Sequence, residues 1–273
     1  MTLRGCAQQL RAELSARNQE YARARNIAVV HSRGDPPVVL YEPAEDGFSH
    51  GNFHPTSYRA IVARPEWRKR LQKRHAQARE ALPRNLRPHW NELDSSCSSD
   101  ALLMNIFCHP KTLGDSRVWV LGEEAAGEPQ FGLKARVPLV GDRADRTEID
   151  MRLGNLLVEA KLTELDFQRR TCEVLESYRD FVEVFDRRAL PRRESEFCGY
   201  QLIRNVLAAH AMECSFCVLL DARRPDLLEQ WYAVMRCVKP AELRTRMKVL
   251  TWQELAEVLP KDLQGFLKVK YGI

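Results

Sequence analysis

Residues 148–161 read E-I-D-M-R-L-G-N-L-L-V-E-A-K and combine three acidic residues with a lysine. Gly154 and Asn155 form a two-residue turn signal between two runs in which apolar and polar residues alternate. This pattern is typical of a β-hairpin whose strands pair from Leu153 and Leu156 outward. The spacing therefore predicts which side chains share a face.

Counting outward in register places Asp150 opposite Glu159 and Glu148 opposite Lys161. Side chains alternate between the faces of a strand, so these four polar residues lie on one face. The other face is expected to be core and carries Ile149, Met151, Leu153, Leu156, Val158 and Ala160. Two carboxylates directly opposite each other repel unless a positive group lies between them.

A hard divalent cation fits that role. Magnesium prefers oxygen ligands, and Asp150, Glu159 and the carbonyl of Ala160 would supply them. Lys161 would lie beside the metal, where it could orient or help deprotonate an attacking water or stabilise negative charge on a phosphate. The alternative is a solvated hairpin in which Glu148 and Lys161 form an ordinary cross-strand ion pair.

The arrangement resembles the PD-(D/E)xK nuclease superfamily, whose motif is an acid on one strand followed by an acid, any residue and a lysine on the next. The matching residues are Asp150, Glu159 and Lys161, whereas Ile149 stands where the motif has proline. The resemblance implies a restriction-endonuclease-like fold and metal-dependent hydrolysis of DNA phosphodiesters, with Mg²⁺ as cofactor and Mn²⁺ as a substitute.

The surrounding residues are similar to an uncharacterised restriction-endonuclease-like branch. Its S-S-x-A-L-x-x-N segment, E-x-K-x-T-E closure and Y-Q-L-x-R segment match Ser98, Ser99, Ala101, Leu102, Asn105, Glu164, Tyr200, Gln201, Leu202 and Arg204. This similarity covers about residues 90–255 and implies that Ser98 and Ser99 contact the substrate.

Further elements are expected on both sides of the hairpin. The patterns predict helices at residues 94–107, 163–185, 196–212, 225–238 and 252–259, and strands at residues 117–121, 132–138, 215–220 and 248–251. The helix at 94–107 opens with a serine-rich cap. The helix at 163–185 opens with a T-x-x-D capping box formed by residues 163–166 and is expected to bury Leu175, Tyr178, Val182 and Phe185. The chain is thus expected to be α/β (α+β), with a mixed central sheet flanked by helices.

Two of these helices could add to the site. Glu164, in the expected first turn after the hairpin, could hold a second metal or a metal-bound water, or could merely favour the helix dipole. Gln201 and Arg204 are three apart and share a helix face. There Gln201 could orient water or phosphate and Arg204 could pair a phosphate oxygen, or both could be a surface polar pair.

Charge is distributed unevenly along the 273 residues, whose net charge is +5. Residues 1–90 hold 16 Lys and Arg against 8 Asp and Glu, which leaves the remainder at −3. Residues 64–79 are the densest run and predict a basic helix that could contact phosphates through Arg68, Lys69 and Lys73, or could be a solvated face. We place a basic, mainly helical region at 1–90 and the nuclease-like domain at 91–273.

Other metal and catalytic patterns are weak. Cys214 and Cys217 form a C-x-x-C with no second pair to complete a zinc site, so the eight cysteines are expected to be reduced and structural. An iron-sulfur cluster would also need Cys172 and Cys198. His50 and His54 are four apart, but their glycine- and proline-containing context argues against a helix that would bring them together.

No long apolar segment or secretory signal is found in the sequence, and a cytoplasmic protein without membrane contact is expected. The leading hypothesis is a magnesium-dependent endodeoxyribonuclease that binds DNA and works as a homodimer, with the dimer resting on family analogy. The alternatives are a catalytically silent DNA-binding module and a repair or recombination nuclease acting on branched DNA.

Overall fold

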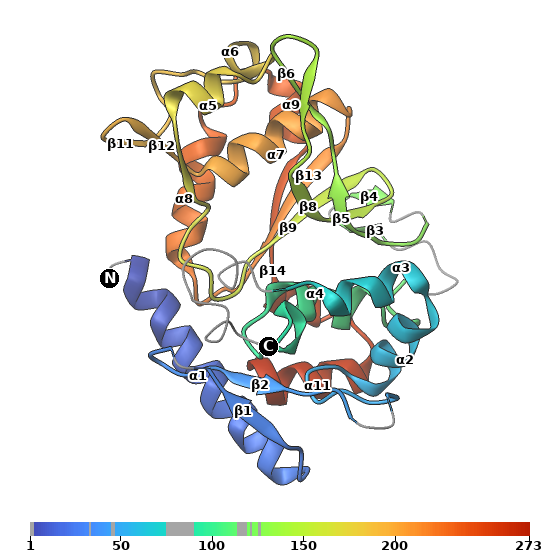
Figure 1. The fold of residues 1–273 in the computed structure, drawn as a ribbon. Coiled ribbons are helices and arrows are strands. Elements are labelled where there is room, and N and C mark those ends of the chain that lie inside the picture. Colours follow the sequence, from blue (N-terminus) through green and yellow to red (C-terminus); the bar gives the residue numbers. More distant parts are fainter. Residues whose placement is uncertain are drawn as a thin grey trace. The chain divides into compact units, whose positions relative to one another are not determined.

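The computed structural model describes residues 3–32, 34–44, 47–74, 90–113, 119–120, 122–124 and 127–273 (Figure 1). Contacts divide the chain into two compact units. Unit 1 comprises residues 1–6 and 117–251, and unit 2 comprises residues 7–116 and 252–273. This division does not coincide with the predicted boundary near residue 90, because residues 91–116 lie in unit 2. Which parts fold on their own stays a prediction.

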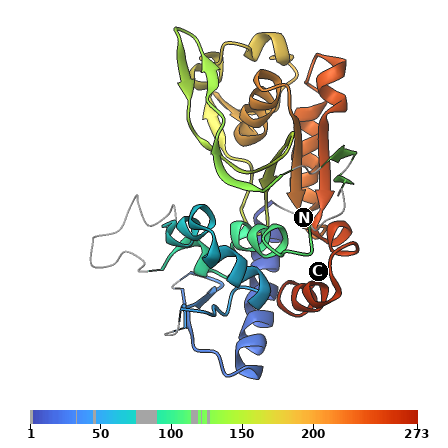
Figure 2. The ribbon, with the colours of Figure 1, turned by 90° about the vertical axis from the view of Figure 1, so that its right-hand side faces the viewer.

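Unit 1 is built on a five-stranded mixed sheet of order β14-β13-β9-β8-β5. Its strands are β5 Gln130–Lys134, β8 Glu148–Leu153, β9 Leu156–Ala160, β13 Ser215–Leu220 and β14 Met247–Thr251. The strands β9, β13 and β14 run parallel, whereas β8 is antiparallel to both of its neighbours. Figure 2 shows β13 and β14 side by side in orange. This sheet and its flanking helices confirm the predicted fold class.

The hairpin β8–β9 has the predicted register over the three residue pairs next to the turn, from Leu153–Leu156 to Met151–Val158. One step further out, the Asp150 carboxylate accepts a hydrogen bond from the backbone N–H of Ala160 at 2.8 Å. All of β9 is buried, because this strand lies inside the sheet and both of its faces are covered.

Two helices supply much of the core of unit 1. The helices α7 Tyr200–Ala211 and α8 Pro225–Met235 pack against each other, and α7 contacts β9 and β13. Their apolar residues share a buried cluster with Leu157, Phe216 and Val218 from the sheet. The strand predicted at 215–220 and the helix that follows it are confirmed, and this helix ends three residues earlier than expected.

The prediction of one long helix from residue 163 to 185 is wrong. Residues 161–168 form an irregular loop, which we call the 161–168 loop, and β10 Arg169–Thr171, α5 Cys172–Glu176 and α6 Phe181–Val184 follow it. The backbone carbonyls that a helix would use internally accept hydrogen bonds from elsewhere. Those of Leu162, Glu164 and Leu165 accept from the Arg224 guanidinium, and those of Phe167 and Gln168 accept from the first N–H groups of α7 and from Gly199.

The expected burial in that segment is mostly confirmed. Leu175, Tyr178 and Phe185 are buried, but Val182 is 64% exposed. The next helix starts later than predicted, because residues 196–198 form β12 Glu196–Cys198 and Gly199 begins α7 with a φ of 77°. Glycine adopts this left-handed conformation without strain, which allows an abrupt change from strand to helix.

The remaining elements of unit 1 are short. They are β3 Trp119–Val120, β4 Glu123–Glu124, β6 Val137–Leu139, β7 Arg143–Asp145, β11 Arg192–Arg193 and α9 Ala241–Thr245. The strands β6 and β7 form a hairpin, and β12 pairs with both β10 and β11. The strands predicted at 117–121 and 132–138 correspond to β3 and to the separate strands β5 and β6, with residues 117, 118 and 121 outside the described part.

Unit 2 is mainly helical. Its elements are α1 Leu3–Ala24, which begins in unit 1, and β1 Val29–His31, β2 Val39–Tyr41, α2 Pro55–Ala63, α3 Pro65–Arg68, α4 Ser99–Phe107, α10 Trp252–Ala256 and α11 Lys261–Tyr271. The helix α4 starts five residues later than predicted, after a 3₁₀ turn Glu92–Asp94. Its serine cap is confirmed, because the Ser98 hydroxyl accepts the N–H of Ala101.

The basic run does not form one long helix. The helix α3 is followed by a 3₁₀ turn Lys69–Gln72, and Lys73 has an extended conformation, so the helix ends before residue 79. Residues 75–89 lie outside the described part of the chain. In the residues that are described, no helix is long and apolar enough to cross a membrane.

Candidate metal and active site

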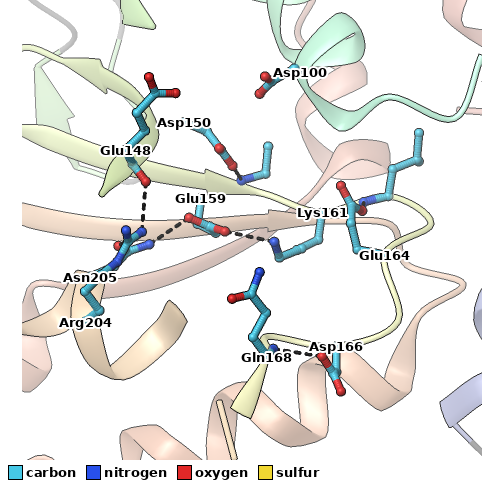
Figure 3. A network of polar contacts seen from close by, with 12 residues as sticks. Asp100, Glu148, Asp150, Glu159, Lys161, Glu164, Asp166, Gln168, Arg204 and Asn205 are labelled. Atoms are coloured by element: carbon cyan, nitrogen blue, oxygen red, sulfur yellow. Dashed lines mark hydrogen bonds and ion pairs between the residues drawn. The ribbon is translucent and has the colours of Figure 1, made fainter. Parts of the chain in front are cut away.

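The polar end of the hairpin brings Glu159 and Lys161 together inside unit 1. Lys161 Nζ donates a hydrogen bond to Glu159 Oε1 at 2.8 Å, and the side chains are only 2% and 6% exposed for Glu159 and Lys161. The backbone of Lys161 is fixed as well, because its N–H donates a hydrogen bond to the carbonyl of Leu219 on β13. The predicted proximity of these side chains is thus present in the structure (Figure 3).

Helix α7 holds the second oxygen of the same carboxylate. Asn205 Nδ2 donates to Glu159 Oε2 at 2.7 Å, and Asn205 is fully buried. Arg204 in turn donates to Asn205 Oδ1 at 2.8 Å and to the backbone carbonyl of Glu148 at 2.9 Å. The helix therefore fixes both the orientation of Glu159 and the end of strand β8.

Negative charge exceeds positive charge around Lys161. Burial alone would lower the pKa of Lys161, but the carboxylates of Glu159, Glu164 and Asp150 outweigh it and raise the pKa. The ammonium form is thus favoured in this arrangement. Three carboxylates near a single ammonium group leave a surplus of negative charge that a cation would offset.

The 161–168 loop completes the surroundings of the site. Glu164 Oε2 accepts a hydrogen bond from the backbone N–H of Leu162 at 2.6 Å, and Glu164 is only partly buried. No helix forms here, so the helix-dipole role considered for Glu164 is wrong. The exposed Gln168 has a φ of 61°, and Figure 3 shows its side chain pointing toward Lys161.

The donor set fits a hard divalent cation. Asp150, Glu159 and Glu164 offer carboxylate oxygens, which Mg²⁺ and Mn²⁺ prefer. The hydrogen bonds already made by Glu159 leave ligand capacity, because each carboxylate oxygen has two lone pairs. A role for the Ala160 carbonyl stays a prediction, and the backbone N–H of this residue donates to the Asp150 carboxylate at 2.8 Å.

Arg204 occupies a buried position. It is 2% exposed, and its Nε and Nη1 atoms are buried without a hydrogen-bond partner. The expectation of a surface polar pair with Gln201 is wrong for this member of the pair. Gln201 lies one turn before Asn205 on α7, and the prediction that its side chain faces the site stays a prediction. The roles of Gln201 and Arg204 toward water or phosphate stay predictions.

The other predicted substrate contacts lie in unit 2. Ser98 and Ser99 are each 7% exposed, and Ser98 caps α4. Lys73 donates to Asp100 at 2.7 Å and to Glu92 at 3.2 Å. Arg68 and Lys69 are exposed. DNA contact by any of these residues stays a prediction.

Three residues of the site were missed by the sequence analysis. Asn205 follows Arg204 and lies four residues after Gln201, a spacing that could have revealed it on the same helix face. Gln168 and Arg224 carry no such signal, because their positions depend on how the 161–168 loop folds. Arg224 donates hydrogen bonds to carbonyls of this loop, although it lies about sixty residues further along the chain.

The predicted cysteine chemistry agrees with the structure, in which all eight cysteines are free. Among the described residues, one group of three His, Cys, Asp or Glu side chains has its ligand atoms within 4.8 Å of one another; it contains no cysteine, and Asp150, Glu159 and Glu164 do not form such a group either. The four cysteines considered for an iron-sulfur cluster therefore do not form such a group. The members of the group that is found are two histidines and an aspartate of unit 2.

Comparison with known proteins gives one family. No curated protein and no solved structure matches the chain. The family model described as "Restriction Endonuclease associating with ARP" matches residues 15–272, which is nearly the whole chain. The mixed sheet of the chain brings Glu159 and Lys161 together at the end of a hairpin. Because the family model matches nearly the whole chain, the chain belongs to this restriction-endonuclease family.

Proposed function

We propose that the protein is a metal-dependent endodeoxyribonuclease with a centre of the PD-(D/E)xK type. The observation that carries the proposal is the buried pair of Glu159 and Lys161 at the end of β9, with Asp150 on the neighbouring strand bonded to Ala160. Membership of a restriction-endonuclease family supports it. DNA is the proposed substrate, and a homodimer remains a proposal from the resemblance.

Each residue has a role that follows from its position. Asp150 and Glu159 would hold Mg²⁺ or Mn²⁺, with Glu164 as a further ligand. The metal, when bound, supplies a Lewis acid that lowers the pKa of water and offsets phosphate charge. Lys161 would orient the attacking water and stabilise negative charge that develops on the phosphate. Asn205 keeps Glu159 in place.

The test is cleavage of supercoiled plasmid and of a panel of flap and junction substrates, with Mg²⁺, with Mn²⁺ and with chelator. We compare the wild type with Lys161→Met, and with Lys134→Met as a control at an exposed lysine of the same sheet. Circular dichroism checks that Lys161→Met folds, because Lys161 is buried. Metal-dependent cleavage that Lys161→Met loses and Lys134→Met keeps is expected.

Two results would contradict the proposal. Cleavage that survives the chelator or the Lys161→Met change would place the chemistry elsewhere. Failure of the wild type to cut any DNA of the panel, with DNA binding retained in a folded Lys161→Met variant, would favour the silent DNA-binding module.

A further inference from the structure

A second group of metal-ligating side chains lies in unit 2, outside the nuclease-like site. His54 is the N-cap of α2, His109 follows the end of α4, and Asp262 is in the first turn of α11. Each residue offers one ligand atom, and these atoms lie within 4.8 Å of one another. Segments from both ends of the chain thus meet at one point within the unit.

The arrangement around His109 indicates a ligand. His109 is 1% exposed, and its Nε2 atom is buried without a hydrogen-bond partner. This nitrogen is 3.5 Å from Asp262 Oδ2, too far for a good hydrogen bond. The rings of His54 and His109 lie 5.2 Å apart, and Phe266 packs edge-on against His54 at 5.4 Å. A buried nitrogen left unpaired is costly unless something binds it.

The charges of the group suit a metal ion. Burial lowers the pKa of both histidines, whereas the neighbouring Asp262 carboxylate raises it. Burial would raise the pKa of Asp262. The hydrogen bond from the backbone of Leu263 and the charges of the nearby histidines outweigh burial and lower this pKa. The positive charges of Arg59 and Lys111 also act on the rings and weaken the attraction for a cation.

We propose that His54, His109 and Asp262 bind one zinc ion, which ties helix α11 to the segments that carry the two histidines. Two imidazoles and one carboxylate are a zinc donor set, and a water would complete a tetrahedral site. Zinc bonds of about 2.0–2.1 Å require ligand atoms roughly 3.4 Å apart, so the group closes when it binds. Asp262, whose side chain is 50% exposed, has the freedom to move inward.

Binding has one cost that sets its strength. The Nδ1 atoms of His54 and His109 accept the N–H groups of Thr56 and Lys111, each at 3.3 Å. Coordination through Nε2 moves the ring proton to Nδ1 and gives up these hydrogen bonds, which are already long. The affinity should therefore be weaker than that of structural zinc sites built on cysteine thiolates. This site does not depend on the proposed nuclease activity.

The test uses the full-length protein with excess Mg²⁺, which occupies hard oxygen sites, and adds Zn²⁺ or Co²⁺ as the probe. We compare the wild type with Asp262→Asn and His54→Gln, and with His31→Gln as a control at an exposed histidine of the same unit. Zinc content per chain, the visible d–d absorption of Co²⁺ and the shift of Tm with Zn²⁺ are measured.

One Zn²⁺ per wild-type chain is expected, together with a tetrahedral Co²⁺ spectrum and a rise in Tm of about 3 °C or more at saturating Zn²⁺. Asp262→Asn and His54→Gln should lose the Co²⁺ band and the Tm shift, whereas His31→Gln should keep them. Two variants are used so that a folding defect in one of them does not decide the result. Circular dichroism shows whether each variant is folded.

The proposal is overturned if the wild type binds no stoichiometric Zn²⁺. It is equally overturned if both folded variants bind Co²⁺ as the wild type does. Strong thiolate charge-transfer absorption in the near ultraviolet would place the metal on cysteines instead.

Discussion

Glu159 shows how single residues prepare the proposed centre. Its two carboxylate oxygens each accept a hydrogen bond, one from Lys161 at 2.8 Å and one from Asn205 at 2.7 Å. A buried carboxylate without such partners would be strongly destabilising, and a mobile one would be a poor ligand. Asn205 is therefore a positioning residue, because it acts on Glu159 and is not expected to touch the substrate.

Replacing Asn205 with alanine should slow cleavage without weakening DNA binding. The change leaves Glu159 Oε2 without its donor, and residues that orient metal ligands are typically worth about 10- to 100-fold in activity. Single-turnover cleavage rates and DNA Kd values measure the two effects. The exposed Asn155, at the turn of the hairpin, provides the control Asn155→Ala. An equal loss in both variants would sink the assignment.

At the scale of elements, Arg224 determines the path of the 161–168 loop. This arginine is fully buried, bonds three loop carbonyls and pairs with Asp226 at 2.8 Å. Because Lys161 and Glu164 lie on this loop, one side chain after β13 positions part of the site. An irregular segment of this kind is stable only when its carbonyls are satisfied from outside.

Changing Arg224 to methionine should lower the free energy of unfolding by about 3 kcal/mol, since it leaves Asp226 and several carbonyls buried without partners. Hydrogen exchange in residues 161–168 should rise, and urea unfolding measures the stability. Arg193→Met, at an exposed arginine of the same unit, is the control and should change stability by less than about 1 kcal/mol. Unchanged exchange in the loop would refute this role.

A buried ion cluster fixes the start of α4 in unit 2. Asp100 is 4% exposed and accepts from Arg70 and Lys73, each at 2.7 Å. Burial alone would raise the pKa of Asp100, but Lys73 and Arg70 outweigh it and lower the pKa. The cluster explains why the basic run turns inward instead of presenting all of its charges to solvent.

Asp100→Asn should destabilise the protein by about 2 kcal/mol at neutral pH. We expect a smaller loss of stability than for a fully buried pair, because Lys73 is partly exposed. In addition, burial and the charge of Asp100 raise the pKa of Glu92, and the substitution removes the repulsion from Asp100. The folded-state pKa of Asp100 lies below its unfolded value, so its stabilisation is present above about pH 4 and is lost as the pH falls through the folded value.

Urea unfolding of both proteins from neutral pH to about pH 3 tests this pH dependence. The stability difference between the wild type and Asp100→Asn should shrink toward the acid end, whereas that for Glu66→Gln, at an exposed position of α3, should stay near zero. A difference that grows in acid would contradict the sign of the pKa shift.

The elements also show what the sequence could predict. The hairpin register was predictable because the turn signal at Gly154 and the alternation of residues are local. The 161–168 loop was not, because a capping pattern favoured a helix while Arg224 and α7, distant in sequence, took the carbonyls a helix needs. Likewise, Leu153 and Glu159 could be assigned to faces, but the contact of Asn205 depends on how α7 packs.

For the whole molecule, the asymmetry of charge is the feature most relevant to DNA. Residues 1–90 have twice as many basic as acidic residues. Within the basic run, Arg70 and Lys73 pair with Asp100, while Arg68 and Lys69 are exposed. The exposed pair has the accessibility that phosphate contact requires, because a charge already paired with a carboxylate offers less to a phosphate.

The double change Arg68→Gln and Lys69→Gln should weaken duplex binding and reduce the slope of log K against log salt by about 2. The charge-matched control replaces Lys261 and Lys268, which are exposed on α11 in the same unit, with glutamine. Fluorescence anisotropy over a series of salt concentrations gives the slopes. If both double variants change the slope equally, net charge and not this surface attracts the DNA.

The central claim is that the carboxylates at the end of the hairpin form the metal centre of a nuclease. The most direct measurement is the rate of plasmid cleavage during a Mn²⁺ titration for the wild type, Asp150→Asn and the control Asp142→Asn, at an exposed turn. Asparagine can still accept the N–H of Ala160, so Asp150→Asn should fold. We predict saturable Mn²⁺ activation of the wild type and of Asp142→Asn, with at least about 100-fold slower cleavage by Asp150→Asn. Equal cleavage by the three proteins at every Mn²⁺ concentration would contradict the account.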